Sequence, residues 1–134
     1  MEMTFVDANI FLEILLDDEK AQQCVNFLRS AEDEGTMLIT TDFVVYTCFI
    51  QAERNARGYK SIKEAILFFD KLTNLKVIRP TIDDLNLAAE LMDANKLDFD
   101  DSLIVACMEN NNIRKLASLD RHFDKVKGIE RIKL

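Results

Sequence analysis

Short apolar runs alternate with longer amphipathic stretches along the chain. Five runs of four residues are rich enough in apolar side chains to form buried strands: MTFV at 3–6, MLIT at 37–40, KVIR at 76–79, KLAS at 115–118 and IERI at 129–132. The stretches between them repeat apolar residues at helical spacing. Strands that alternate with helices predict an α/β fold in which helices cover both faces of a mainly parallel sheet.

Three helix ends carry recognisable sequence signals. The helical stretch 19–34 stops at Gly35, a residue that favours the left-handed cap at a helix C-terminus. SIKE at 61–64 has the sequence of a capping box that opens a helix, and TIDD at 81–84, directly after Pro80, resembles a second one. We therefore expect one helix to end at the glycine and two helices to begin at these boxes.

Aspartates stand at the ends of three predicted strands. Asp7 directly follows MTFV, Asp42 follows MLITT and Asp120 follows KLASL. Because ligands of open α/β sheets bind beyond the carboxyl ends of the strands, these side chains are candidates for one shared site.

A fourth candidate, Asp101, begins an apolar helix that is predicted over 97–111, and Asp98 and Asp100 lie in the same first turn. Acids in a first turn also cap free N–H groups and complement the helix dipole. Capping is the favoured interpretation for Asp98. For Asp101, capping and a site role both stay open.

Carboxylates that converge at strand ends repel one another unless a divalent cation neutralises them. The candidate ligands are all oxygens, because His122 is the lone histidine and no thiol cluster exists. Such a set suits Mg²⁺ or Mn²⁺ rather than zinc or a redox metal. A bound ion of this kind supports hydrolysis of a nucleic-acid backbone. On spacing alone, ordinary surface acids remain an equal alternative.

Composition limits the class of protein. The length of 134 residues, 49% hydrophobic, with three glycines and one proline, predicts a single compact domain over 1–134. No apolar run approaches the roughly 20 residues of a membrane span, and no export signal precedes the first strand, so we expect a cytoplasmic protein without membrane contact. The three cysteines, Cys24, Cys48 and Cys107, lie in apolar helical patterns and are expected to be buried free thiols.

The net charge of −7 argues against a generally basic nucleic-acid surface. The charge is uneven, however, because 113–134 carries seven bases against three acids. A second basic group surrounds Gly58 and consists of Arg54, Arg57, Lys60 and Lys63. Each group is either ordinary solvated surface or part of a phosphate-binding rim around the acidic centre.

Four segments together resemble the motifs of the PIN-domain nucleases, and in size the chain is most similar to the small VapC-type toxin ribonucleases. The segments are FVDANIFLEILL at 5–16, LITTDFVVYT at 38–47, LDFDDSLIVACMENNN at 97–112 and LASLDRHFDKV at 116–126. The resemblance implies a three-layer α/β/α fold with a central, mainly parallel sheet. It also implies RNA hydrolysis with Mg²⁺ or Mn²⁺, a homodimer, and an antitoxin segment bound over the active-site groove.

By position, the resemblance makes Asp7, Asp101 and Asp120 the catalytic, metal-binding carboxylates. Asn9 and Ser118 become polar supports beside them.

One position departs from the family pattern. The helix after the second strand supplies a glutamate in similar domains, and Thr47 stands there in this chain. Asp42 and Glu53 lie on other faces of that helix, so neither simply replaces the glutamate. Asp98, Asp100 and Asp124 are further candidates to complete the site. Asp124 leads them because it follows Asp120 by one helical turn.

Two function classes follow from this pattern. The first is a metal-dependent endoribonuclease that acts as the toxin of a toxin–antitoxin pair. The alternative is a catalytically weak or inactive PIN-fold module that binds RNA or protein, which Thr47 favours. A phosphatase or nucleotide hydrolase is weaker, because the three glycines form no phosphate-binding loop.

Overall fold

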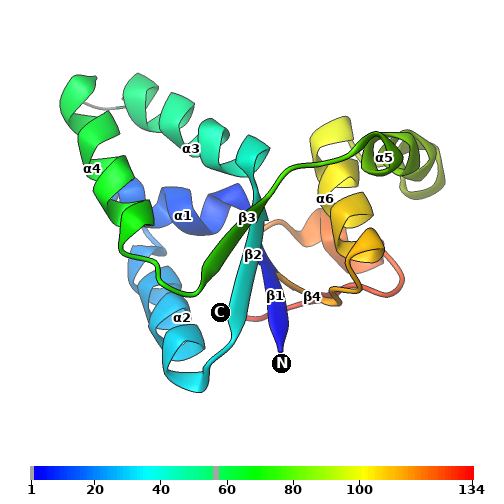
Figure 1. Ribbon diagram of the computed structural model, residues 1–134, viewed down its shortest axis with the longest axis horizontal. Helices are drawn as coiled ribbons and strands as arrows, with labels where there is room; N and C mark the ends of the chain where they lie inside the picture. The colour runs from blue at the N-terminus through cyan, green and yellow to red at the C-terminus, as the bar shows by residue number, and fades with distance from the viewer. Residues whose placement is uncertain (1, 56–57) are drawn as a thin grey trace.

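A five-stranded parallel sheet forms the centre of the molecule (Figure 1). The structure is a computed structural model that describes residues 2–55 and 58–134. The strands are β1 (Met3–Val6), β2 (Met37–Thr41), β3 (Leu75–Ile78), β4 (Lys115–Ala117) and β5 (Glu130–Arg131). Their order across the sheet is β3-β2-β1-β4-β5, and every neighbouring pair is parallel. The predicted parallel sheet is confirmed.

Helices cover both faces of this sheet, which confirms the three-layer α/β/α architecture. They are α1 (Ala8–Leu15), α2 (Ala21–Glu34), α3 (Asp42–Asn55), α4 (Tyr59–Asp70), α5 (Ile82–Asn95), α6 (Phe99–Asn110) and the 3₁₀ helix η1 (Arg121–Lys125). Figure 1 shows α1 to α4 on one side of the sheet and α5 with α6 on the other. Within the described residues, no helix is long and apolar enough to span a bilayer.

Two of the three predicted helix ends are confirmed. Gly35 caps α2 with a left-handed backbone, φ 73°. Thr81 and Asp84 form a reciprocal capping box at the start of α5. The box predicted at 61–64 is wrong, because α4 already begins at Tyr59 and Ser61 lies buried inside its first turn. Gly58, with φ 58°, lets the chain reverse early enough for the helix to start there.

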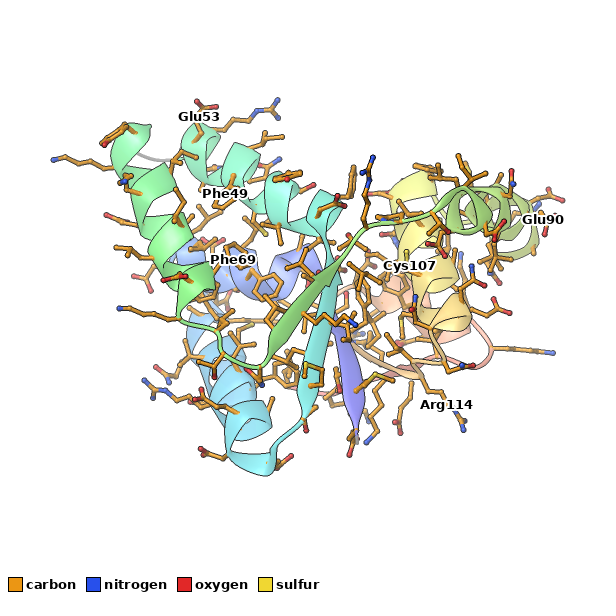
Figure 2. The ribbon with its side chains drawn as sticks, viewed as in Figure 1. Phe49, Glu53, Phe69, Glu90, Cys107 and Arg114 are labelled. Atoms are coloured by element: carbon orange, nitrogen blue, oxygen red, sulfur yellow. The ribbon has the colours of Figure 1, made fainter. Side chains whose placement is uncertain are left out.

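Aromatic side chains join α1, α3 and α4 on one face of the sheet. The ring of Phe69 lies 5.0 Å from that of Phe11 and 5.7 Å from that of Phe49, both in edge-to-face geometry. Figure 2 shows Phe49 and Phe69 in this helical layer. Such packing gives α1 a rigid base, and α1 begins directly after Asp7.

On the other face, α6 is buried around its whole circumference. Every residue from Ser102 to Met108 is buried, whereas the sequence predicted one apolar face. The reason is that α6 packs against α5 as well as lying next to the sheet, as Figure 2 shows around Cys107. The three cysteines are buried free thiols, as predicted, and burial raises the pKa of Cys48 and Cys107 to about 12.

Candidate metal centre at the strand ends

The candidate centre lies where the order of the strands reverses. From β1 the sheet grows towards β2 on one side and towards β4 on the other, so β1 and β4 flank the switch point. The crevices of open α/β sheets form at such points. Asp7 follows β1 directly, and its backbone N–H donates to the carbonyl of Ala117 at the end of β4, at 3.0 Å. Asp120 follows three residues after Ala117. Both aspartates therefore belong to one crevice.

Asp7 is held by three local donors although it is almost fully buried. Its Oδ1 accepts from the backbone N–H of Ala8 at 2.7 Å, as an N-cap does. Its Oδ2 accepts from Ser118 Oγ at 2.7 Å and from Asn9 Nδ2 at 3.3 Å. Burial raises the pKa of Asp7 above its usual value, against the effect of the Ser118 and Ala8 hydrogen bonds. A carboxylate stands at the edge of the core because these donors fix it there.

Asn9 and Ser118 also fix the loop that carries Asp120. The side-chain oxygen of Asn9 accepts from the backbone N–H of Leu119 at 3.1 Å. Ser118 Oγ accepts from the backbone N–H of Asp120 at 3.1 Å while donating to Asp7. These contacts place both polar residues between the two carboxylates.

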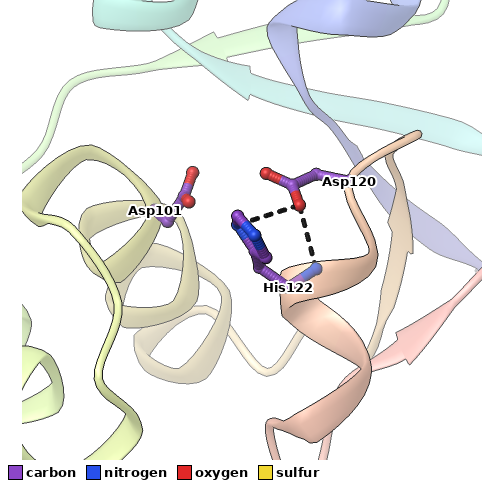
Figure 3. A group of neighbouring side chains, drawn as sticks. All are labelled: Asp101, Asp120 and His122. Carbon is purple, nitrogen blue, oxygen red and sulfur yellow. Dashed lines mark hydrogen bonds and ion pairs between the residues drawn. The ribbon is translucent and has the colours of Figure 1, made fainter.

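Asp101, Asp120 and His122 form a compact cluster, in which one ligand atom from each residue lies within 4.8 Å of the others. Figure 3 shows the imidazole between Asp101 on α6 and Asp120 after β4. Asp120 is the N-cap of η1, and its Oδ1 accepts from the backbone N–H of His122 at 2.9 Å. His122 Nδ1 lies 3.1 Å from the same oxygen. The donor set of two carboxylates and one imidazole fits a divalent transition ion.

His122 belongs to this cluster although the sequence pattern does not single it out as a ligand. The pattern predicts an oxygen-only ligand set, in which the lone histidine argues against zinc. The available signal was the Asp-x-His spacing. A capping aspartate accepts a hydrogen bond from the backbone N–H two residues later, which places the side chain of that residue close to the aspartate.

Electrostatic repulsion is concentrated on Asp101. Burial raises its pKa to about 6, and the negative charges of Asp100, Asp7 and Asp120 add to the effect, while His122 opposes it. The charges of Asp120 and Asp100 also raise the pKa of Asp7. A cation would relieve this repulsion, so the charge pattern fits a cation-binding centre.

Asp101→Asn is expected to stabilise the metal-free protein at neutral pH. The pKa of Asp101 is raised from 3.8 to about 6, so folding favours its protonated form. Stability from this preference is full below about pH 4 and is lost as the pH rises through about 6. The asparagine removes that loss, which amounts to about 1–2 kcal/mol after allowing for partial solvation. Urea unfolding with EDTA at about pH 4 and about pH 7.5 measures it. An equal effect at both pH values contradicts the assignment.

The remaining acidic candidates occupy other positions. Asp124 forms a bidentate ion pair with Arg131, at 2.7 and 3.0 Å, and this pair lowers the pKa of Asp124. Asp42 caps its own helix, where its Oδ1 accepts from the backbone N–H of Phe43 at 2.7 Å. Neither belongs to the cluster of Asp101, Asp120 and His122. Figure 2 shows Glu53 towards the end of α3 that is remote from the sheet.

The other candidate residues lie in the first turn of α6 and at position 47. Asp98 occupies the predicted N-cap position of α6, but its side chain makes no capping hydrogen bond. Asp100 is exposed and acts through its charge on Asp7 and Asp101. The hydroxyl of Thr47 donates to the carbonyl of Phe43 in its own helix at 2.9 Å.

The three-layer fold has counterparts among known proteins. The PIN-domain family matches residues 4–129, and the chain belongs to this family. It is 28% identical to Ribonuclease VapC6 of Methanocaldococcus jannaschii, over 96% of this chain and 95% of that protein.

Solved toxin structures share the fold at lower sequence identity. VapC20 of Mycobacterium tuberculosis, described as a Sarcin-Ricin loop cleaving toxin, superposes with a TM-score of 0.77 at 19% identity, covering 92% of this chain and 95% of that one. A toxin–antitoxin complex from Klebsiella pneumoniae gives a TM-score of 0.71 at 16% identity, with 95% of each chain covered.

Proposed function

We propose that residues 1–134 form a single PIN domain that acts as a metal-dependent endoribonuclease, the toxin of a toxin–antitoxin pair in the cytoplasm. The observation that carries the proposal is the convergence of Asp7, Asp101 and Asp120 at the switch point of the sheet, in a chain of the PIN family. The reaction is hydrolysis of RNA phosphodiester bonds. The cofactor is Mg²⁺ or Mn²⁺.

Asp101 and Asp120 would hold the cation, with Asp7 beside them. A cation bound there would orient the phosphodiester and lower the pKa of a water molecule. Ser118 and Asn9 hold Asp7 and the Asp120 loop in register, so the carboxylates do not have to reorganise when RNA arrives. Changes to Ser118 or Asn9 should therefore alter the rate of RNA cleavage by shifting the position of Asp7 and Asp120.

Exposed bases in η1 provide the phosphate-binding side of the site. Arg121 and Lys125 belong to the same short helix as His122. In the second basic group, Arg54 lies in the last turn of α3 and Lys60 and Lys63 lie in α4, and Figure 1 shows both helices on the other side of the sheet from α6. Arg57 of that group lies outside the described residues. The bases near His122 are therefore the better candidates to contact RNA.

The direct test is incubation of purified protein with single-stranded RNA. Cleavage should require Mn²⁺ or Mg²⁺ and stop on addition of EDTA. One observation favours the second candidate, a module that binds without turnover: the Thr47 hydroxyl bonds its own helix and adds no negative charge to the centre. RNA binding without cleavage at any metal concentration would select that candidate.

A homodimer and an antitoxin complete the proposed assembly. The apolar sequence segment FFDKL at 68–72 is not a free contact surface, because Phe68, Phe69 and Leu72 pack against the core. The outer faces of α3 and α5 expose Phe43, Tyr46, Ile50, Ile82 and Leu85, and α4 exposes Tyr59, Ile66 and Leu67. These faces are better candidates for contacts between subunits.

Light scattering at micromolar concentration is expected to give the mass of a dimer. Tyr46, 60% exposed, and Ile82, 70% exposed, are the residues to change. Tyr46→Glu or Ile82→Glu should shift the mass to that of a monomer, because a charge on an apolar contact face is costly to bury. A monomeric parent protein would contradict the dimer.

A further inference from the structure

The imidazole of His122 lies close to the carboxylates of Asp101 and Asp120. The resemblance to PIN domains implies a glutamate at position 47, where this chain has the uncharged Thr47. Of the described residues, His122 is the one that joins Asp101 and Asp120 within 4.8 Å. It is also the single histidine of the chain. The chain thus has one carboxylate fewer than the resemblance implies, and it has a nitrogen donor close to Asp101 and Asp120.

The distances agree with shared coordination of one ion. Ligands about 2.1 Å from an octahedral ion lie about 3 Å apart when they are adjacent. His122 Nδ1 and Asp120 Oδ1 are 3.1 Å apart. A carboxylate oxygen of Asp101 lies within 4.8 Å of both ligand atoms, so a small movement of this side chain would bring it into the same coordination sphere. The pair is therefore spaced as neighbouring ligands, with Asp101 on the other side of the ring (Figure 3).

The backbone sets this arrangement in place before any ion binds. Asp120 caps η1 and accepts the backbone N–H of His122 at 2.9 Å, so the carboxylate and the root of the imidazole are fixed together. The His122 side chain is 72% exposed, which leaves the ring open to an ion arriving from solvent. A preformed donor on the open side of the centre costs little ordering on binding.

We propose that His122 is a direct ligand of the divalent cation, so that the centre prefers Mn²⁺ and similar transition ions to Mg²⁺. This inference rests on the proposed function, because it assigns a ligand to the same cation. Imidazole suits first-row transition ions, whereas Mg²⁺ takes oxygen ligands and retains its waters. His122 supplies the donor that position 47 lacks. If the ring only donates Nδ1–H to Asp120, it orients a ligand and is not one.

Electron spin echo envelope modulation of the Mn²⁺-loaded protein separates these two roles. The protein must carry no histidine tag, so that His122 provides the only imidazole. Modulation from directly coordinated ¹⁴N should be present, and ¹⁵N-labelling of histidine alone should change it. This comparison uses the unaltered chain and does not depend on the folding of a variant.

Titrations with Mn²⁺ and with Mg²⁺ supply the second readout. His122→Ala should weaken Mn²⁺ binding about 10–100-fold and Mg²⁺ binding much less, so the preference for Mn²⁺ collapses. Lys127→Gln is the matched control, since it changes an exposed basic side chain two residues beyond the end of η1, and it should alter Mn²⁺ affinity less than about threefold.

Three results overturn the inference. In the first, Mn²⁺ binding requires the aspartates, but ¹⁵N-labelling of histidine does not change the modulation. This result refutes His122 as a ligand and leaves the proposed function intact. Equal losses of Mn²⁺ and Mg²⁺ affinity in His122→Ala refute the metal preference. Absence of any Mn²⁺ or Mg²⁺ binding refutes the inference and the metal-dependent function together.

Discussion

Asp101→Asn is expected to reduce Mn²⁺ binding below detection by calorimetry and to lower the rate of RNA cleavage at least about 100-fold. Changes to residues that merely orient a ligand already cost about 10–100-fold in affinity or activity, so loss of a charged ligand should cost at least as much. The fold should survive, because asparagine keeps the shape of the side chain and removes the charge of a carboxyl group whose pKa is raised by burial. Asp7→Asn should have the same effect on binding.

Asp83→Asn is the matched control for this pair. Asp83, like Asp101, is an acid in the first turn of a helix, but it is exposed and lies outside the cluster. The control should bind Mn²⁺ and cleave RNA as the parent does. Full Mn²⁺ binding in both Asp7→Asn and Asp101→Asn would show that the cation binds elsewhere.

Thr47→Glu is expected to produce the second large effect, in the opposite direction. The threonine hydroxyl now bonds the Phe43 carbonyl, so the change removes one local hydrogen bond and adds a carboxylate where similar domains have one. Mn²⁺ affinity should rise about 10–100-fold, and RNA cleavage should rise with it. Asp120→Asn in the same background should cancel the gain, because both groups would act on one ion.

Gln51→Glu tests whether any added charge on α3 suffices. Position 51 is one helical turn beyond position 47, further from the strand end. It should change Mn²⁺ affinity far less. If the parent already cleaves RNA and Thr47→Glu changes neither binding nor rate, the threonine is no defect and other groups complete the centre.

The central strands β1 and β2 were predictable because each is a short apolar run. Phe5 in β1 and Leu38 in β2 are fully buried, as expected for strands of a parallel sheet that helices cover on both faces. Gly35 was predictable for a similar reason, since a left-handed cap requires little from the rest of the fold. The capping-box sequence at Ser61 predicted the wrong start for α4. That sequence is a local signal, whereas the helix begins where the backbone turns at Gly58.

The direction of each acidic side chain was not predictable from spacing. Asp98, Asp100 and Asp101 share one turn, and packing of α6 between the sheet and α5 decides which of them joins Asp120. Asp124 follows Asp120 by one turn, yet Arg131 from β5 takes both of its oxygens. His122 was missed because its contact with Asp120 arises from a cap in a short 3₁₀ helix.

The most direct test of the central claim is the anomalous scattering of Mn²⁺ in a crystal of the unaltered protein. The account predicts a peak at about 2.2 Å from carboxylate oxygens of Asp101 and Asp120, at the switch point between β1 and β4. The peak should be absent from Asp101→Asn crystals treated in the same way. A peak at another place, or no peak at millimolar Mn²⁺, would contradict the assignment of this cluster as the metal centre.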